Sequence, residues 1–346
     1  MNYPCLKIDL GKISHNSKII RARCAQLGIS VVGVTKCVLG DVKIAEAIKK
    51  SGVNILGDSR LENLIRLRNF YGSEQQLMML RSPMPSEIRD LVEICDISLN
   101  TDLKVVEIIA KICQEKGIKH RVVVMVETDD QREGLLAEDA VNFCRQVVDN
   151  YESIEIYGLG TNARCVTKNG PAPASLRMLI DLSQKIMEAT GRNIPVISGG
   201  NSSIWNLIEE GLIPDGINQV RMGEAILMGH NTVDYKPVKG AFLDCFLLEA
   251  EIIEVKKKDS ETYKVILALG LQDVSSKNIY CCSPGLYIMG QSSDHTILGI
   301  KEDRSGKSRD DYLKLEAGGM ISFNLDYFGL LSCMTSPFVK KSYIEG

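Results

Sequence analysis

The sequence predicts an α/β protein, a (β/α)8 TIM barrel followed by a C-terminal all-β domain. Its 346 residues exceed the usual size of one compact domain. Short apolar runs alternate with longer amphipathic segments between residues 29 and 223, which is typical of repeated β/α units. From about residue 236 strand-like runs follow one another without helical segments, which favours a separate β domain.

After an initial strand, "CLKIDL", eight apolar runs are expected to form parallel strands. They are "ISVVGVTK", "NILGDS", "QLMMLRS", "DISLN", "HRVVVMVET", "IEIYGLGT", "IPVISGG" and "GINQVRMG". Segments 41–51, 102–116 and 173–190 have apolar residues at three and four spacing and begin with an acidic residue or a proline, as helices do. Eight such units in about 230 residues fit a closed barrel better than an open doubly wound sheet.

The C-terminal third contains four strand-like runs. They are "AFLDCFLLEAEIIEVKKK", "TYKVILALG", "LYIMGQSSDHTILGI" and "MISFNLDYFGLLSCM". We therefore expect a barrel domain at 1–235, whose first strand joins the β domain, and a β domain at 236–346.

Composition narrows the class of partner. Hydrophobic residues make up 45% and charged residues 25%, which are ordinary values for a folded protein, and the net charge of −3 supplies no basic field for nucleic acid or anionic lipid. The start lacks a signal-peptide pattern, and no apolar run approaches the roughly 20 residues of a membrane span. Eleven scattered cysteines without CxxC spacing indicate reduced thiols and no metal site. We expect a cytoplasmic protein that binds a small molecule.

In a barrel of this kind the carboxyl ends of the strands carry the active site. Lys36 closes the first of the eight runs, Arg132 follows the fifth and Asn162 follows the sixth. The segment "GGNSS" (199–203) follows the seventh, and Arg221 lies in the eighth. These residues are the first candidates for a functional site.

Lys36 is a candidate nucleophile. The low-dielectric mouth of a barrel would disfavour its ammonium form, and the free amine would then attack a carbonyl to form a Schiff base. The alternative is a structural lysine that extends into solvent or pairs with a carboxylate such as Asp58.

The segment "SGGNSS" offers small residues and free N–H groups at a helix start, where a phosphate binds well, although it is also consistent with an ordinary helix cap. Its place on the penultimate strand, with "RMGE" on the last, is where barrel phosphate sites commonly lie. Arg221 is either a structural arginine or a cation held against a pyridine nitrogen. In the second case it keeps that nitrogen unprotonated and makes the ring a weaker electron sink.

These residues, in this order, resemble the fold-type III pyridoxal phosphate enzymes, most closely the alanine racemase family. The stretches "YPCLKIDLGKISHNSKIIR", "VETDDQREG", "NSS" and "VRMGEAILMG" carry the resemblance, which covers nearly the whole chain. It implies pyridoxal 5′-phosphate as the cofactor and Lys36 as its Schiff-base lysine. It also implies Arg132 near the phenolic oxygen and the substrate carboxylate, Ser202 and Gly223 at the phosphate, and Arg221 at the ring nitrogen.

Three further positions are implied cofactor contacts. Asn162 replaces the family's ring-stacking histidine. Glu224 stands where alanine racemases have an apolar residue beside the phosphate, so that only its backbone N–H can help there. Tyr327 matches a C-terminal tyrosine that contacts phosphate, or else is a core residue of the sheet.

The chain departs from the family at the catalytic tyrosine of the β domain. The matching stretch is "GLQDV", with Leu271 at that position. Racemisation needs two proton-transferring groups on opposite faces of a planar carbanion. Lys36 can serve one face, so a different residue must serve the other.

The loop "GQSSDH" (290–295) ranks first for this second group. Asp294 matches an active-site aspartate of the racemase β domain, and His295 is of the residue type that changes protonation most readily near neutral pH. Cys281 and Cys282 rank next. The alternative for His295 is an ordinary histidine of a surface loop.

The stretches "GLGTNARC", "ISGGNSS", "VRMGEAILMG" and "GQSSDH" look most like the branch that contains ornithine racemases. Gly40 stands where alanine racemases have a tyrosine that narrows the substrate pocket, so we expect a larger pocket. Acidic side chains that could pair with the second ammonium of ornithine or lysine are Asp41, Asp58, Glu127, Asp129, Asp130 and Asp294.

The sequence therefore predicts a two-base racemase of ornithine or a similar basic amino acid. The alternatives are a fold-type III amino-acid decarboxylase, an alanine racemase, and a non-enzymatic carrier of pyridoxal phosphate, against which the additional β domain weighs. The resemblance also implies a head-to-tail homodimer with shared active sites.

Overall fold

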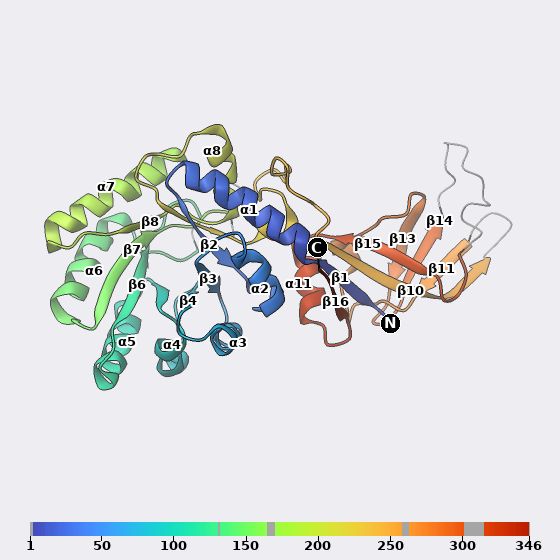
Figure 1. The fold of residues 1–346 in the computed structure, drawn as a ribbon, viewed down its shortest axis with the longest axis horizontal. Helices are drawn as coiled ribbons and strands as arrows, with labels where there is room; N and C mark the ends of the chain where they lie inside the picture. The colour runs from blue at the N-terminus through green and yellow to red at the C-terminus, as the bar shows by residue number, and fades with distance from the viewer. Residues whose placement is uncertain (1–2, 131, 165–169, 258–262, 301–314, 346) are drawn as a thin grey trace. The chain divides into compact units, whose positions relative to one another are not determined.

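A computed structural model describes residues 3–130, 132–164, 170–257, 263–300 and 315–345 of the chain. Contacts divide the chain into two units. One unit is Ile13–Leu243 and contains the strands β2 to β9 with the helices that connect them, and the other comprises Met1–Lys12 with Asp244–Gly346 and is mainly β-sheet (Figure 1). Among the described residues no helix combines the length and the apolar character that a membrane crossing requires.

Eight parallel strands, β2 to β9, form a closed barrel in chain order, which confirms the predicted fold class. The last strand pairs with the first, with Val32 opposite Arg221. Each predicted apolar run supplies one strand. The strands are Ser30–Val34 (β2), Ile55–Asp58 (β3), Gln76–Met79 (β4), Ile97–Asn100 (β5), His120–Met125 (β6), Ile154–Gly160 (β7), Val196–Ser198 (β8) and Gln219–Met222 (β9).

Helices connect these strands on the outside of the barrel (Figure 1). The predicted segments 41–51, 102–116 and 173–190 are the helices α2, α5 and α7. The helices are Leu10–Gln26 (α1), Val42–Lys49 (α2), Leu61–Tyr71 (α3), Ile88–Ile94 (α4), Leu103–Lys116 (α5), Ala137–Asn150 (α6), Pro173–Thr190 (α7), Trp205–Glu210 (α8) and Glu224–Met228 (α9), with short 3₁₀ turns at Lys36–Val38 (η1), Pro85–Glu87 (η2) and Ser202–Ile204 (η3).

The interior of the barrel is packed with apolar side chains. Side chains from β2, β4, β5 and β6 meet in one buried cluster, which only the inner face of a closed sheet allows. Its buried members are Val32, Met78, Ile97, Leu99, Val123 and Met125. The barrel is thus a solid core, and a ligand can bind only at its ends.

A buried polar group lies on the outer face of the same wall. Because side chains alternate along a strand, Ser98 and Asn100 point away from the cluster that holds Leu99. Ser98 Oγ lies 2.9 Å from Nε2 of His120, and Asn100 Nδ2 donates to Ser98 Oγ at 2.9 Å. Burial lowers the pKa of His120 to about 4. The folded barrel therefore holds this imidazole neutral.

His120 makes the folded chain sensitive to acid. Between pH 6.5, the usual histidine value, and pH 4 the unfolded chain binds a proton that the folded chain excludes, so the free energy of unfolding falls as the pH drops. The loss amounts to at most about 3 kcal/mol. We expect His120→Gln to flatten the decline of thermal stability between pH 6.5 and pH 4.5. His15→Gln, which removes an exposed histidine, should leave the decline unchanged, and equal slopes for all three proteins would contradict this account.

The second unit is built on a sheet with the strand order β12-β15-β10-β11-β14-β13, and β1 pairs with β10 and β16. These neighbours are antiparallel except β1 and β16, which are parallel. The elements are Cys5–Asp9 (β1), Phe246–Lys257 (β10), Tyr263–Leu267 (β11), Ser276–Asn278 (η4), Ile279–Cys281 (β12), Leu286–Gln291 (β13), Thr296–Ile300 (β14), Met320–Leu325 (β15), Tyr327–Thr335 (α11) and Lys340–Ile344 (β16).

The prediction of strands without helices in this third of the chain is wrong at α11. The run "MISFNLDYFGLLSCM" is strand β15 up to Leu325 and helix from Tyr327 onward. Asp326 caps the helix by accepting a hydrogen bond from Gly329 N at 2.8 Å. A continuous apolar run without clear periodicity does not distinguish a buried helix from a strand. In this run the capping residue Asp326 marks where the helix begins.

Candidate active site

The described site lies at the carboxyl end of the barrel, where β2 and β9 end side by side. Gly223 follows β9, and a Cβ atom on it would lie 3.0 Å from Val34 Cβ and 3.3 Å from Val34 O. This close approach places the start of α9 next to the residues that follow β2. Lys36, which the sequence predicted as a site residue, is two positions after Val34 and therefore lies in this region.

Lys36 is the first residue of η1, and its side chain is exposed. The expected burial of the amine is therefore not seen in the barrel unit described by itself. Within the described residues the Lys36 ammonium makes no hydrogen bond or ion pair. The alternative in which it pairs with Asp58 is also not what the structure shows, because Asp58 is completely buried and bonds other groups.

Arg221 is buried in the barrel wall and joins three strands. Its Nη1 donates to Ser198 Oγ at 2.9 Å, and its Nη2 donates to Thr161 O at 2.8 Å. Ser198 ends β8 and Thr161 follows β7, so the guanidinium is fixed across the ends of β7, β8 and β9. Because two nitrogens of the planar guanidinium donate to two fixed acceptors, the orientation of the Arg221 side chain is fixed.

Ser202 joins the two segments that the sequence predicted to bind phosphate. Its buried Oγ accepts hydrogen bonds from Gly223 N at 3.4 Å and from Ala225 N at 3.2 Å. The start of η3 and the start of α9 therefore meet at one hydroxyl. We call residues 199–203 and 223–225 the serine cradle.

Glycine is required at two positions of the serine cradle. Gly200 has φ +119°, a conformation that other residues rarely adopt. A Cβ on Gly199 would lie 2.6 Å from Ile204 Cδ1. The backbone of the cradle is therefore fixed by packing and is left without side chains at these two points.

Asn162 belongs to a chain of side-chain amides beside the cradle. Its Nδ2 donates to Asp130 Oδ2 at 3.2 Å, and its Oδ1 accepts from Asn201 Nδ2 at 2.9 Å. Asn201 in turn caps η3 by accepting from Ser203 N at 2.8 Å. Asn162 thus links the end of β7 to the cradle by hydrogen bonds.

The remaining predicted residues of the barrel unit are Arg132 and Glu224. Arg132 Nη2 pairs with Oε1 of its neighbour Glu133 at 2.6 Å, and its side chain is partly exposed. Glu224 is the first residue of α9 and is half-buried. Both lie on the same end of the barrel as Lys36, since they follow the carboxyl ends of β6 and β9.

The structure does not support the prediction of a larger substrate pocket at Gly40. Gly40 has φ +61°, and a Cβ on it would lie 2.9 Å from Asn63 O. The missing side chain therefore makes room for Asn63 at the start of α3, and a side chain at this position would point at that helix. Other acidic candidates are bonded within the barrel unit, as Asp58 is, because Asp41 caps α2 and Asp129 accepts from Ser175 Oγ at 3.0 Å.

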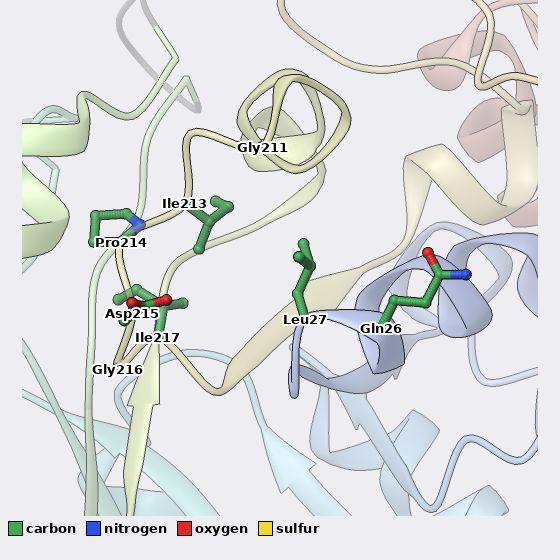
Figure 2. A pocket seen from close by; sticks show the side chains of 8 residues that line it. All are labelled: Gln26, Leu27, Gly211, Ile213, Pro214, Asp215, Gly216 and Ile217. Carbon is green, nitrogen blue, oxygen red and sulfur yellow. The ribbon is translucent and has the colours of Figure 1, made fainter.

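A cavity of about 320 Å³ lies at the opposite end of the barrel. Figure 2 shows it between the end of α1 and the segment before β9, so it adjoins the amino ends of the strands. Its lining residues are Gln26, Leu27, Gly211, Ile213, Pro214, Asp215, Gly216 and Ile217. None of the predicted site residues lines this cavity, and we do not assign the catalytic site to it.

In the β unit the structure brings together two segments that the sequence treated separately. Leu271 N donates to Ser292 O at 3.0 Å, and Gln272 N donates to Ser293 O at 3.0 Å. A Cβ on Gly270 would lie only 2.2 Å from Ser293 O. Leu271, the position that the sequence resemblance matched to the family's catalytic tyrosine, is therefore hydrogen-bonded directly to the loop 292–295, which we call the serine loop.

Asp294 and His295 form a pair in the serine loop. His295 Nδ1 lies 3.0 Å from Asp294 Oδ1, and the side chains are 45% and 60% exposed respectively. Hydrogen bonds from Ser293, His295 and Ser292 lower the pKa of Asp294. The carboxylate thus stays ionised, which suits an acceptor for the imidazole better than a group that exchanges protons.

Two other predicted groups lie elsewhere in the β unit. Burial raises the pKa of the Cys281 and Cys282 thiols, which favours their protonated form. Tyr327 is half-buried at the start of α11, with its ring 5.8 Å from that of Phe328.

Comparison with known proteins identifies the class. The family model "Alanine racemase, N-terminal domain" matches residues 8–231. A lysine racemase of Thermotoga maritima is 33% identical over 99% of this chain and 99% of its own, and an ornithine racemase of Acetoanaerobium sticklandii is 30% identical over 99% and 100%. Among solved structures, an alanine racemase of Clostridium difficile shares the fold with a TM-score of 0.77 at 19% identity, covering 100% of this chain and 97% of its own.

The barrel with its serine cradle is thus the fold of a pyridoxal-phosphate-dependent amino-acid racemase. The chain belongs to the alanine racemase family, as the sequence motifs indicated. Membership of this family favours the predicted racemase over the two alternatives, a fold-type III decarboxylase and a non-enzymatic carrier of pyridoxal phosphate.

The residues of the barrel mouth fit the cofactor. The serine cradle offers N–H groups and a hydroxyl free of blocking side chains, which suits a phosphate. Arg221 supplies a fixed cation, and Lys36 supplies an exposed amine with no partner among the described residues. The N–H groups, the hydroxyl, the cation and the amine together suit a ligand that carries both a phosphate and an aldehyde, as pyridoxal phosphate does.

The sequence placed Thr161 and Asn201 at strand ends but predicted no role for them, and it missed Ser198. In the structure Ser198 and Thr161 orient Arg221, and Asn201 links Asn162 to the cradle. Ser198 is the last residue of its strand, so extending the search for polar residues by one position into each strand could have found it.

Arg221 is expected to stabilise the barrel as well as the site. Replacement by lysine leaves one ammonium for two partners on different strands, so Ser198 Oγ or Thr161 O loses its donor. We expect Arg221→Lys to lower the free energy of unfolding by about 1–3 kcal/mol. Chemical denaturation of the cofactor-free chain measures this. Arg192→Lys on the surface is the control, and equal stability of both variants would contradict the assignment.

Proposed function

We propose that this racemase interconverts the L and D enantiomers of ornithine, lysine or a similar basic amino acid. The observation that carries the proposal is the match of 33% and 30% identity, along the full chain, to proteins named for lysine and ornithine. Similarity to alanine racemases covers the fold at lower identity, so alanine remains the second candidate.

The carboxyl side of β6 supports a substrate with a second positive charge. Glu127, Asp129 and Asp130 follow this strand within five positions, and Asp130 is buried. Three carboxylates near one strand end create a negative potential that favours an ammonium group over a methyl group. We assign recognition of the side-chain ammonium to this acidic segment.

We assign the cofactor to the residues of the barrel mouth. Lys36 binds it covalently, Ser202 and the N–H groups of Gly223 and Glu224 bind its phosphate, and Arg221 faces its ring nitrogen. When bound, pyridoxal phosphate delocalises the electrons left by Cα–H cleavage. Arg221 limits this delocalisation because its cation keeps the ring nitrogen unprotonated, and this favours return of a proton over side reactions.

Further contacts with the cofactor or substrate are assigned to three residues. Asn162 lies beside the cradle and flanks the ring, Arg132 binds the substrate carboxylate, and Tyr327 of the β unit contacts the phosphate. Support comes from the family motifs and, for Asn162, from its hydrogen bond to Asn201 of the cradle.

Lys36 moves the proton on one face of the substrate, and we assign the other face to His295. The serine loop is hydrogen-bonded to Leu271, where the family has its catalytic tyrosine, so a group on this loop can act from nearly the same place. A proton held on Nδ1 by Asp294 leaves Nε2 free to accept or donate a proton. Asp294 therefore orients the imidazole, and His295 exchanges the proton.

The substrate assignment is tested by racemisation of ornithine, lysine and alanine, followed by polarimetry or chiral chromatography. We expect the value of kcat/KM for ornithine or lysine to exceed that for alanine by about tenfold or more, the effect of one buried charge pair. Asp130→Asn should reduce this preference, and Lys36→Ala should be inactive with all three. A clear preference for alanine would overturn the assignment.

The two-base assignment is tested by exchange of the Cα proton with solvent deuterium. In His295→Asn we expect exchange to continue with one enantiomer, through Lys36, and to fall by about a hundredfold or more with the other. Asp294→Asn should cause a smaller loss. Asp234→Asn, which removes a carboxylate that is hydrogen-bonded in the barrel unit, is the control. Equal loss with both enantiomers in His295→Asn would contradict the assignment.

We also propose a homodimer in which the serine loop of one subunit serves the barrel of the other. Lys36→Ala and His295→Asn chains are then each inactive, but a mixed dimer contains one site with both native residues. We expect mixing and re-equilibration of the two variants to restore up to about a quarter of the native activity, because half of the dimers are mixed and each has one native site. No recovery in a proven mixed dimer would contradict shared sites.

A further inference from the structure

The residues that carry Lys36 form a tight turn, residues 35–40, which we call the lysine turn. The amides of Val38 and Gly40 both donate to Thr35 O, at 3.0 and 3.3 Å. Leu39 N donates to Lys36 O at 3.3 Å. These bonds fix the backbone on both sides of the lysine.

The lysine turn contains an unfavourable backbone conformation. Leu39 has φ 55° and ψ 35°, the left-handed region, and Gly40 follows with φ +61°. A bulky residue rarely adopts this region, and it persists only where the surroundings hold it. The turn therefore needs support from outside its own hydrogen bonds.

Asp58 at the end of β3 provides part of this support. It is completely buried, and its Oδ2 accepts from Thr35 Oγ1 at 2.7 Å. Its Oδ1 accepts from Arg60 N and Asn63 Nδ2, both at 3.0 Å. Burial of a carboxyl group is costly unless donors surround it, and here one of the donors is the residue directly before Lys36.

The start of α3 supports the far side of the lysine turn. Arg66 Nη1 donates to Leu39 O, the residue with the left-handed conformation. Gly40 lies so close to Asn63 that a Cβ on it would be 2.9 Å from Asn63 O. Asn63 bonds Asp58 as well, so one carboxyl group and one helix start hold both ends of the turn.

The Asp58 carboxyl does not act on Lys36 directly. Its two oxygens are bonded to Thr35, Arg60 and Asn63, and within the described residues it makes no ion pair with the Lys36 ammonium. Asp58 can therefore affect the position of the Lys36 amine only indirectly, through its hydrogen bond to Thr35.

We propose that Asp58 is a positioning residue, which through the Thr35 hydroxyl sets the direction in which Lys36 presents its amine to the cofactor. The inference rests on the proposed covalent role of Lys36. Loss of the Thr35 hydroxyl leaves the amine chemically intact and lets the turn move, and a small misplacement of a reacting group slows reaction by about tenfold to a hundredfold.

The test measures how fast the cofactor-free, full-length chain captures pyridoxal phosphate at Lys36. Samples are quenched with borohydride at short times, and the labelled peptide is quantified by mass spectrometry. Thr35→Val keeps the shape of the side chain and removes its hydroxyl, whereas Thr35→Ser keeps the hydroxyl. We expect Thr35→Val and Asp58→Asn to capture the cofactor about tenfold or more slowly than wild type, and Thr35→Ser to remain close to wild type.

Ser98→Ala is the matched control, because it also removes a buried hydroxyl from a barrel strand but does not touch the lysine turn. All variants are assayed well below their thermal midpoints, and Asp58→Asn serves if Thr35→Val does not fold. Capture by Thr35→Val at the wild-type rate, or equal slowing in Ser98→Ala, would overturn the proposal. Wild-type protein that is not labelled at Lys36 would instead contradict the proposed function itself.

Discussion

Closure of the barrel between β2 and β9 is the constraint on which the site depends. The two strands come from opposite ends of the barrel sequence, yet hydrogen bonding makes them neighbours. Gly223 then packs against Val34, which brings the serine cradle next to the lysine turn. In an open sheet these strands would lie on separate edges, and the lysine turn and the serine cradle would be far apart.

Two buried charged side chains hold the loops at the carboxyl end of the barrel in place. Arg221 holds the ends of β7 and β8, and Asp58 holds the lysine turn. A buried charge is tolerated only with several hydrogen bonds, so each of these groups fixes the loops that supply its partners. Side chains at this end of the barrel can then be exposed and still keep one direction, because buried groups hold the loops that carry them.

In the β unit, backbone hydrogen bonds join two loops that are apart in the sequence. Leu271, the position that the sequence resemblance matched to the family's tyrosine, is bonded to the loop that carries Asp294 and His295. The two loops therefore hold each other in place, and a side chain on either loop is presented from a fixed backbone. The chemistry that such side chains perform has to be argued from the residues themselves, because a fold alone does not determine it.

The sequence by itself determined the eight barrel strands, three of the helices between them and the family, because strand and helix periodicity and short motifs are local signals. It did not separate β15 from α11, since an apolar run fits either. Only the tertiary structure decided that Gly40 makes room for α3, that Asp58 bonds Thr35, and that Leu271 adjoins the serine loop. These facts depend on contacts between segments that are distant in the chain, which no local pattern encodes.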